Sequence, residues 1–303
     1  MAANVNFSGA LVRDNIAFKK DARLAEYSTF KIGGEAGYIV FPNSSEQFIS
    51  AIRSAKKNGV RFDIVGNASN ILFADEGYDG AIIVTKKISD LRINGSAEIE
   101  CGCGVMLPRL AAMAAEESLS GVEFACGIPG TVGGAVFMNA GAYGNEMGDV
   151  LVCSTAYDIK KDEIVEISLA EHEFSYRHSA YMKNTDLVCI GARLKLQVGD
   201  AREIKEKMDI FNSKRRASQP IAFANAGSFF KRPEGHFAAK LIDDCGLKGY
   251  RIGDACVSDK HAGFIVNLGG ATSKDVLELS EYVAERVFSE TGIKLEREVR
   301  FIG

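Results

Sequence analysis

The stretch GIPGTVGGAVFMNAGAYG, residues 127–144, decides how the rest of the chain is interpreted. It holds six glycines in eighteen positions, and the phenol of Tyr143 is its one ionisable group. Glycine lets backbone N–H groups approach a ligand without interference from Cβ, and successive N–H groups in tight turns bind anions such as diphosphate. A set of tight turns would need glycine as well, so glycine content alone leaves both interpretations open.

The surrounding sequence favours the ligand. No strand followed by GxGxxG opens a helix, and no GxxxxGK[ST] is present, so neither a Rossmann site nor a P-loop explains the glycines. A similar loop of small polar residues occurs earlier, in VGNASNILFAD at residues 65–75, directly after an expected strand. We therefore expect the two loops to line opposite sides of one extended cofactor.

Apolar, β-branched runs alternate with amphipathic stretches along the whole chain, which indicates an α/β architecture. Before the glycine-rich stretch we expect strands and helices in alternation, and after it a meander of three strands. A charged helix at residues 200–218 then marks a domain boundary, and a smaller lobe of helices and strands ends in a strand at 294–302. The predicted divisions are an N-terminal segment, 1–29; a first domain, 30–198, with lobes of about 30–90 and 91–198; and a second domain, 199–303.

The charge and composition of the chain limit the kinds of molecule that it is expected to bind. The net charge is −4 and the basic residues gather only in the short KRR at 214–216, which argues against nucleic acid and anionic membranes. No signal peptide or apolar run of spanning length is present, so we expect a cytoplasmic protein. Seven scattered cysteines, without CxxC spacing, are read as reduced and mostly buried thiols, and four histidines without i, i+4 spacing argue against a metal.

Six segments together carry a resemblance to a known family. They are YSTFKIGGEAGYIVFP, VGNASNILFAD, GIPGTVGGAVFMNAGAYG, FSYRHSAY, ANAGSFFKRP and LEREVRFIG, in this order between residues 27 and 303. The chain resembles the UDP-N-acetylenolpyruvoylglucosamine reductases, in the shorter form that lacks an inserted loop in the meander. The resemblance implies a bacterial enzyme of peptidoglycan synthesis, and through it of cell-wall biogenesis, cell shape and cell division.

The same resemblance implies the fold and the cofactor: an FAD-binding domain of the vanillyl-alcohol-oxidase type in two lobes, plus a smaller α/β substrate domain. FAD would be held without a covalent bond, and NADPH would be the co-substrate. The implied cofactor-binding residues lie in the two loops: Gly66, Asn67, Ala68, Ser69, Asn70, Gly127, Gly130, Thr131, Gly133, Gly134, Asn139, Ala140, Gly141 and Tyr143. We expect backbone N–H groups from Gly130 to Gly134 to hold the diphosphate, with Asn139 and Tyr143 at the polar edges of the isoalloxazine.

The implied reaction has two steps: NADPH reduces FAD, and hydride then passes from flavin N5 to C3 of the enolpyruvyl group, with protonation at C2. Three residues match the family's catalytic group. Arg177 would bind the substrate carboxylate, Ser228 would protonate C2, and Glu298 would lie near the reacting carboxylate. Strand alternation would place Glu296, Glu298 and Arg300 on one face.

Arg216 and Lys231 are the candidates for contacts to the UDP diphosphate, although basic residues also gather at helix C-termini for dipole reasons. His261 is interpreted as structural. Two departures from the family pattern bear on binding: Ala68 stands where the family usually has Gly, and Arg232 where it usually has Asn.

Two alternatives stay open at this stage. One is another FAD-dependent sugar or alcohol oxidoreductase of the same fold, many of which tether FAD through His or Cys; only Cys126 lies near the second loop. The other is a flavin-binding module without catalysis, which would leave Arg177, Ser228 and Glu298 without a shared task. The preference between NADPH and NADH and the oligomeric state are not visible in the sequence.

Overall fold

The computed structural model describes residues 2–95 and 97–303, and these form two compact units. Unit 1 contains the chain up to Lys20, Tyr38–Asn67 and Gly80–Lys214, and unit 2 contains Asp21–Gly37, Ala68–Asp79 and Arg215–Gly303. This division differs from the predicted boundaries, because two early segments belong with the C-terminal part of the chain. Helix α6 (Ala201–Ser218) begins in unit 1 and ends in unit 2.

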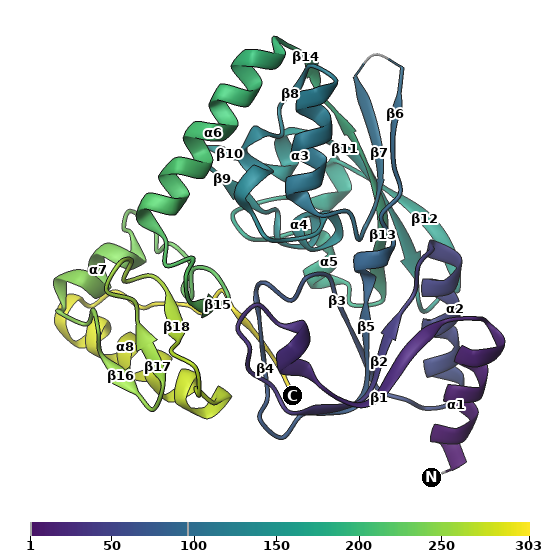
Figure 1. The fold of residues 1–303 in the computed structure, drawn as a ribbon, viewed down its shortest axis with the longest axis horizontal. Coiled ribbons are helices and arrows are strands. Elements are labelled where there is room, and N and C mark those ends of the chain that lie inside the picture. Colours follow the sequence, from purple (N-terminus) through teal and green to yellow (C-terminus); the bar gives the residue numbers. More distant parts are fainter. Residues whose placement is uncertain (1, 96) are drawn as a thin grey trace. The chain divides into compact units, whose positions relative to one another are not determined.

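The larger sheet of unit 1 has five strands in the order β12-β11-β13-β7-β6, and every neighbouring pair is antiparallel. Its strands are β6 (Leu91–Asn94), β7 (Glu98–Gly102), β11 (Leu151–Asp158), β12 (Glu163–Ser168) and β13 (Leu187–Lys195). The three strands predicted after the glycine-rich stretch are present as β11, β12 and β13, but the predicted meander is wrong, because β13 pairs with β11 and not with β12. Helices α3 (Leu107–Glu116), α4 (Val132–Met138) and α5 (Ala180–Lys183) lie beside this sheet (Figure 1).

A second sheet has the order β1-β2-β5-β3, with β3 and β5 parallel. Its strands are β1 (Ala17–Arg23), β2 (Glu35–Phe41), β3 (Phe62–Val65) and β5 (Tyr78–Val84), and its helices are α1 (Ala2–Arg13) and α2 (Ser45–Lys57). The sequence indicated α2 well. The Ser44 side chain accepts the N–H of Gln47 at its start, and Gly59 follows its end at a positive φ of 65°. Helix α1 was not predicted.

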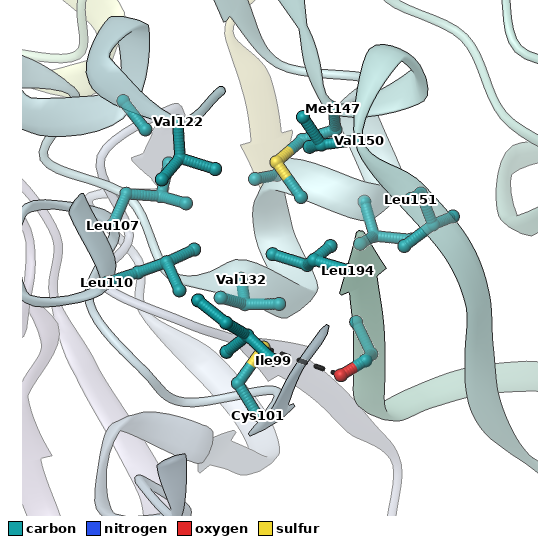
Figure 2. Packing of buried hydrophobic residues seen from close by; sticks show 14 of the residues in the cluster. Ile99, Cys101, Leu107, Leu110, Val122, Val132, Met147, Val150, Leu151 and Leu194 are labelled. Carbon is teal, nitrogen blue, oxygen red and sulfur yellow. Dashed lines mark hydrogen bonds between the residues drawn. The ribbon is translucent and has the colours of Figure 1, made fainter. Parts of the chain in front are cut away.

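The core of unit 1 explains how the glycine-rich stretch is fixed. Val132 and Val136 of α4 are fully buried and pack with Ile99 of β7, Leu107 of α3 and Leu194 of β13 (Figure 2). Each such side chain contributes roughly 1.5–3 kcal/mol when it is fully buried. The apolar positions of the stretch therefore anchor it, while its glycines stay at the surface of this core.

Unit 2 holds the sheet β15-β18-β17-β16, antiparallel throughout, together with α7 (Ala238–Asp244) and α8 (Ser273–Thr291). The strands are β15 (Ala224–Asn225), β16 (Arg251–Ile252), β17 (Ala255–Val257) and β18 (Ile265–Asn267). Thr272 and Asp275 form a capping box at the start of α8, and Gly292 ends it in the left-handed conformation. Strand β4 (Ile71–Phe73) pairs in parallel with β19 (Arg300–Ile302).

The prediction of a strand over 294–302 is wrong for its first part, because only Arg300–Ile302 forms a strand. Four two-residue strands complete the assignment: β8 (Leu119–Ser120) with β14 (Gln197–Val198), and β9 (Gly141–Ala142) with β10 (Asn145–Glu146). All seven cysteines are free thiols and five are buried, as expected. Along the described chain, no helix is long and apolar enough to cross a bilayer.

Candidate active site

The two predicted cofactor loops touch each other inside unit 1. Gly66 follows β3, and a Cβ at this position would lie 2.1 Å from the Thr131 side-chain oxygen. The Asn67 side chain donates to the carbonyl of Pro129 at 2.6 Å. The beginning of the first loop is therefore packed against the beginning of the second, and Gly66 is required by this close approach as much as by any ligand.

The backbone of the glycine-rich stretch is partly committed to the protein. Thr131 caps α4, its hydroxyl accepting the N–H of Gly134 at 3.4 Å. The N–H of Val132 donates to Val105 and that of Gly133 to Cys103, each at 2.8 Å. The expected cradle from Gly130 to Gly134 is therefore too wide, because the N–H groups of residues 132–134 already have partners.

Two donors remain at the start of this stretch. The antiparallel bridge between Met106 and Thr131 is made by flanking residues, since Leu107 donates to Gly130 and Val132 donates to Val105. In such a pair the N–H of the bridged residue points away from its partner strand. Among the residues that the structure describes, no backbone carbonyl accepts the N–H of Gly130 or of Thr131. This uncharged set of donors beside Gly66 fits the diphosphate of a dinucleotide cofactor.

Asn139 has a structural task that its sequence position did not reveal. It ends α4 in the left-handed conformation with φ 42°, and its side chain is fully buried. Its amide nitrogen donates to Glu146 Oε1 at 2.8 Å and to the Ser175 carbonyl at 3.2 Å, and its oxygen accepts the Gly148 N–H at 2.9 Å. The predicted contact of this side chain with the isoalloxazine edge is therefore corrected, because protein groups occupy it.

The rest of the stretch forms a short hairpin. Gly127 ends a 3-10 turn at Glu123–Gly127, and Ala140 donates to the Ala135 carbonyl at 2.8 Å. A Cβ on Gly141 would lie 2.5 Å from the Asn145 carbonyl oxygen, so the hairpin requires glycine there. Tyr143, expected at the flavin edge, stacks on Phe211 of α6 with ring centroids 4.2 Å apart and donates to its carbonyl.

Arg177 lies at the tip of a two-residue turn closed by mutual backbone hydrogen bonds between Ser175 and His178. Its φ is 53°, a left-handed conformation that costs a non-glycine residue roughly 1–2 kcal/mol. The guanidinium donates to the Gly141 carbonyl at 3.2 Å and lies 4.9 Å from the centroid of the Tyr176 ring. Backbone strain at a bulky residue is a reason to look for a role for its side chain, and here the turn holds the guanidinium beside Gly141.

Two members of a buried polar cluster, His172 and Tyr181, flank this turn in sequence, and sequence analysis did not identify the cluster. The Ser154 hydroxyl lies 2.9 Å from His172 Nε2 and 2.7 Å from the Tyr181 hydroxyl, and the His172 ring stacks on Phe174. His172 is fully buried, and this burial lowers its pKa to about 4, so the ring is neutral at pH 7. The charged neighbours Glu171 and Glu173 hid this burial in the sequence.

The Arg177 turn and the glycine-rich stretch are bonded to each other. Besides the contacts of Asn139 and Arg177, the Ser179 hydroxyl donates to the Phe137 carbonyl at 2.8 Å. Two segments that are more than thirty residues apart in sequence thus meet through three side-chain to backbone hydrogen bonds. The candidate carboxylate ligand and the candidate cofactor loop form one rigid surface of unit 1.

Unit 2 brings Ser228 and Glu298 together. Ser228 is exposed after Gly227, which has φ 81° and open space around its missing Cβ. The next residue, Phe229, is buried, and its carbonyl accepts the N–H of Glu298 at 2.9 Å. An antiparallel bridge between Phe230 and Arg297 continues this pairing. The two predicted catalytic residues of this unit thus lie on adjacent, paired segments.

The second half of the first cofactor loop belongs to this unit as well. The Asn70 amide donates to the Glu298 carbonyl at 3.1 Å, and Arg300 donates to the Asn70 carbonyl at 3.0 Å. Ala68 is buried and has φ 47°, so the position that the family usually gives to glycine does require a left-handed backbone. Ser69 is half-buried in the turn between them.

Arg216 and Lys231, the two predicted contacts to the UDP diphosphate, have different partners in the structure. The carbonyl of Arg216, near the end of α6, accepts from Lys260 Nζ at 2.6 Å. Lys231 makes an ion pair with Glu296 at 2.5 Å and donates its N–H to the Glu296 carbonyl. Glu296 therefore does not share a free strand face with Glu298, and its carboxylate balances Lys231. The guanidinium of Arg232 lies 4.9 Å from the centroid of Phe237.

Comparison with known proteins agrees with this architecture. Residues 36–168 match an FAD binding domain, and residues 219–302 match the C-terminal domain of UDP-N-acetylenolpyruvoylglucosamine reductase. A reductase of this name from Caldicellulosiruptor saccharolyticus is 46% identical over 301 residues, 99% of this chain and 96% of the relative. The chain belongs to the UDP-N-acetylenolpyruvoylglucosamine reductase family.

Other members of the reductase family support the same assignment. The protein of that name from Streptococcus pneumoniae strain Hungary19A-6 is 43% identical over 289 residues, 95% of this chain and 94% of the relative. The crystal structure of the Thermus caldophilus reductase is 33% identical with a TM-score of 0.80, and the match covers 95% of this chain and 99% of that one. The expected family, the vanillyl-alcohol-oxidase-type fold and the class of FAD-dependent oxidoreductase are confirmed.

Proposed function

We propose that this chain reduces the enolpyruvyl group of UDP-N-acetylglucosamine enolpyruvate, with NADPH as reductant, and forms UDP-N-acetylmuramate for peptidoglycan synthesis. The observation that carries the proposal is the similarity to reductases of this name over 99% of the chain. One NADPH and one proton are consumed for each double bond reduced. Both substrates are charged and cross membranes poorly, which supports a cytoplasmic site of action.

Bound FAD supplies the hydride that reaches C3 of the enolpyruvyl group. The protein must then hold the substrate carboxylate, stabilise the negative charge that develops there, and deliver a proton to C2. The uncharged N–H groups of Gly130 and Thr131, beside Gly66, are our candidates for the cofactor diphosphate. These residues would bind and orient the cofactor without placing a competing charge next to the substrate.

Arg177 is the proposed ligand of the substrate carboxylate. A guanidinium forms two parallel hydrogen bonds with a carboxylate, and these strengthen as negative charge accumulates. Its strained turn and the hydrogen bond to the Gly141 carbonyl hold the group in place before the substrate binds. A preorganised cation requires no rearrangement when the charge develops.

Ser228 is the proposed proton donor to C2. The hydroxyl is exposed, and the neighbouring Phe229 is fixed through both of its backbone groups. A serine is a weak acid, so it can protonate only a strongly basic carbon and needs stabilisation of its conjugate base. Glu298, on the paired segment, is the proposed hydrogen-bonding group beside the reacting carboxylate, and Arg216 is the proposed diphosphate contact.

The test separates the two halves of the reaction by flavin absorbance. In the Ser228→Ala variant, NADPH should bleach the flavin at the wild-type rate, whereas the enolpyruvyl substrate should restore the yellow colour at least about 100-fold more slowly. Ser228→Thr, which keeps a hydroxyl, is the matched control. A wild-type protein without flavin, or a flavin that the substrate fails to reoxidise, would refute the proposed reaction.

A further inference from the structure

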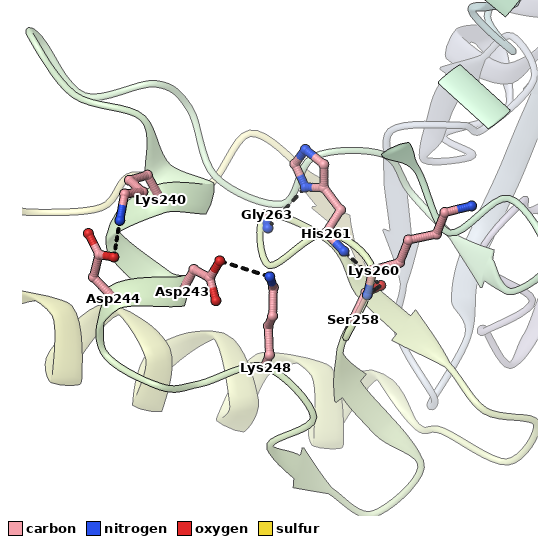
Figure 3. A network of polar contacts seen from close by, with 8 residues as sticks. All are labelled: Lys240, Asp243, Asp244, Lys248, Ser258, Lys260, His261 and Gly263. Atoms are coloured by element: carbon pink, nitrogen blue, oxygen red, sulfur yellow. Dashed lines mark hydrogen bonds and ion pairs between the residues drawn. The ribbon is translucent and has the colours of Figure 1, made fainter. Parts of the chain in front are cut away.

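The loop between β17 and β18 in unit 2 is organised around His261 (Figure 3). The His261 ring accepts the N–H of Gly263 through Nδ1 at 3.2 Å. The backbone N–H of His261 donates to the Ser258 hydroxyl at 3.3 Å, and the backbone carbonyl of His261 accepts the N–H of Phe264 at 3.0 Å. The ring and the backbone of His261 thus both form hydrogen bonds within this tight loop.

Gly263 has no spare room in this loop. A Cβ there would lie 3.1 Å from His261 Cε1 and 3.2 Å from the Ala239 Cβ of α7. The Phe264 ring meets the imidazole edge-on with centroids 4.9 Å apart. A side chain at position 263 would therefore press against the imidazole on one side and against α7 on the other.

The other end of this contact reaches the proposed proton donor. The carbonyl of Gly263 accepts the N–H of Phe229 at 2.8 Å, and the carbonyl of Phe229 accepts the N–H of Glu298 at 2.9 Å. Ser228 immediately precedes Phe229. A series of three hydrogen bonds thus runs from the His261 ring through Gly263 and Phe229 to the backbone of Glu298.

We propose that His261 is a positioning residue for Ser228, which holds the proton donor in place through Gly263 only while its Nδ1 carries no proton. The inference rests on the proposed function, because it concerns the residue assigned there to protonation of C2. Protonation of Nδ1 would place two N–H donors opposite each other. The Gly263 peptide then has to move, and Phe229 and Ser228 move with it.

The surroundings of the ring fix the sign of the pH dependence. Partial burial lowers the pKa of His261 below its usual value of about 6.5; a backbone hydrogen bond opposes this shift, and the positive charge of Lys248 adds to it. Lys248 is itself paired with Asp243 of α7 at 2.8 Å, and Lys240 pairs with Asp244 on the same helix. On the loop, Lys260 donates to the Arg216 carbonyl, and Asp259 approaches Gly249.

Above about pH 6.5 the ring is therefore neutral and the acceptor is in place. As the pH falls through the lowered pKa, the contact with Gly263 is lost, and the substrate-dependent step should slow. Reduction of the flavin by NADPH does not use Ser228, so its rate should not follow the same titration.

The experiment uses the FAD-loaded enzyme in a stopped-flow instrument. The flavin is first reduced with one equivalent of NADPH at pH 7.5 and then mixed with enolpyruvyl substrate in buffers from pH 5 to 8. Two variants are compared with wild type. His261→Asn keeps an acceptor oxygen near the position of Nδ1 but does not titrate, and His261→Leu removes the acceptor. The exposed His236, changed to Leu, is the matched control.

We expect His261→Leu to be reoxidised about tenfold or more slowly at every pH, with an unchanged rate of flavin reduction. His261→Asn should be reoxidised within about threefold of wild type at pH 7.5 and should lose the acidic decline. The proposal is overturned if His261→Leu is reoxidised like wild type, or if His261→Asn keeps the same decline.

A thermal melt would detect whether His261→Leu fails to fold, and in that case Gly263→Ala tests the proposal instead. Gly263→Ala keeps the titrating ring but pushes against it, and should slow reoxidation selectively; a wild-type rate in this variant would also overturn the proposal. A wild-type enzyme that the substrate does not reoxidise defeats the proposed function itself. If the wild-type enzyme turns over and the His261 variants are reoxidised at the wild-type rate, only the role proposed for His261 is wrong.

Discussion

The two units hold their candidate catalytic groups by different means. In unit 1, Arg177 lies at a strained turn that side-chain hydrogen bonds join to the glycine-rich stretch, and the hydrogen-bonded His172 and Tyr181 flank this turn in sequence. In unit 2, Ser228 and Glu298 are fixed by backbone pairing around the buried Phe229. Side-chain networks depend on the identity of each member, whereas backbone pairing tolerates substitution. Unit 1 should therefore be the more sensitive of the two to conservative changes.

The largest expected effect comes from Arg177→Gly, compared with Ser228→Ala. Both should lower the rate of flavin reoxidation by substrate at least about 100-fold, because each removes a group that acts in the transition state. Only Arg177→Gly also relieves a left-handed non-glycine residue, but the larger unfolded-state entropy of glycine and the loss of the hydrogen bond to Gly141 oppose this gain, so the free energy of unfolding should change by less than about 1 kcal/mol.

Stopped-flow absorbance and urea unfolding of the same preparations measure both quantities. Arg177→Lys serves as the control, since it keeps the charge and the strain but loses the planar fork. If Arg177→Gly is reoxidised by substrate like wild type, the interpretation of the strained turn as a functional feature is wrong.

The next effect concerns the buried imidazole of unit 1. Because burial lowers the folded-state pKa of His172 from about 6.5 to about 4, the unfolded chain binds a proton between these pH values that the folded chain does not. This contribution is absent above pH 6.5 and grows as the pH falls, and it lowers the stability by up to about 3 kcal/mol near pH 4.

His172→Gln, which keeps a hydrogen-bonding group near Nε2, should remove this contribution while still contacting Ser154. The free energy of unfolding of wild type minus that of the variant, measured at steps from pH 7 to 4, should therefore decrease with falling pH. A difference that does not change with pH would show that His172 is not buried as a neutral ring. In unit 2 the comparable ring, His261, is only half-buried, so its effect on stability should be smaller.

A third change tests the close approach of the two cofactor loops in unit 1. In Gly66→Ala, the new methyl would lie 2.1 Å from the Thr131 hydroxyl, so the loops must separate. Overpacking of this kind costs typically about 1–3 kcal/mol. We expect a lower melting temperature and weaker FAD binding, measured by fluorescence during dilution. Adding Thr131→Ala removes the hydroxyl and should restore part of the lost melting temperature and of the lost FAD affinity. If neither is restored, the methyl group clashes with something other than the Thr131 hydroxyl.

Local signals in the sequence predicted the regular elements well. Ser44 and Thr272 begin α2 and α8 as N-caps, and Gly59 and Gly292 follow their ends, because these signals depend on neighbouring residues only. The three strands β11, β12 and β13 were equally visible, but their order in the sheet was not, because β13 passes β12 and pairs with β11. The two candidate cofactor loops were singled out by their composition and expected on opposite sides of one cofactor, whereas their direct contact at Gly66 and Thr131 was not predicted.

The failures concern partners that are distant in sequence. Residues 294–299 alternate like a strand, yet they meet their neighbours at single backbone contacts around Phe230, and side-chain alternation does not reveal a missing ladder. Strand β4 belongs to unit 2 because it pairs with β19, more than two hundred residues later. The N–H groups of Val132 and Gly133 are occupied by Val105 and Cys103, which composition does not show.

The smallest expected effect lies at Ala68, where the first cofactor loop enters unit 2. Its φ of 47° is left-handed, so an alanine there costs roughly 1 kcal/mol that glycine would not. Glycine also has a larger unfolded-state entropy, which opposes the gain by about 0.4–1 kcal/mol. Ala68→Gly should therefore change the free energy of unfolding by less than about 0.5 kcal/mol, whereas Ala68→Val, which adds a β-branched side chain at the same backbone conformation, should be clearly destabilising. Urea unfolding of the three proteins measures this order. If Ala68→Val were as stable as Ala68→Gly, the left-handed backbone at position 68 would be wrong. Strain at a non-glycine residue would then be found at Arg177 in unit 1 but not at this loop of unit 2.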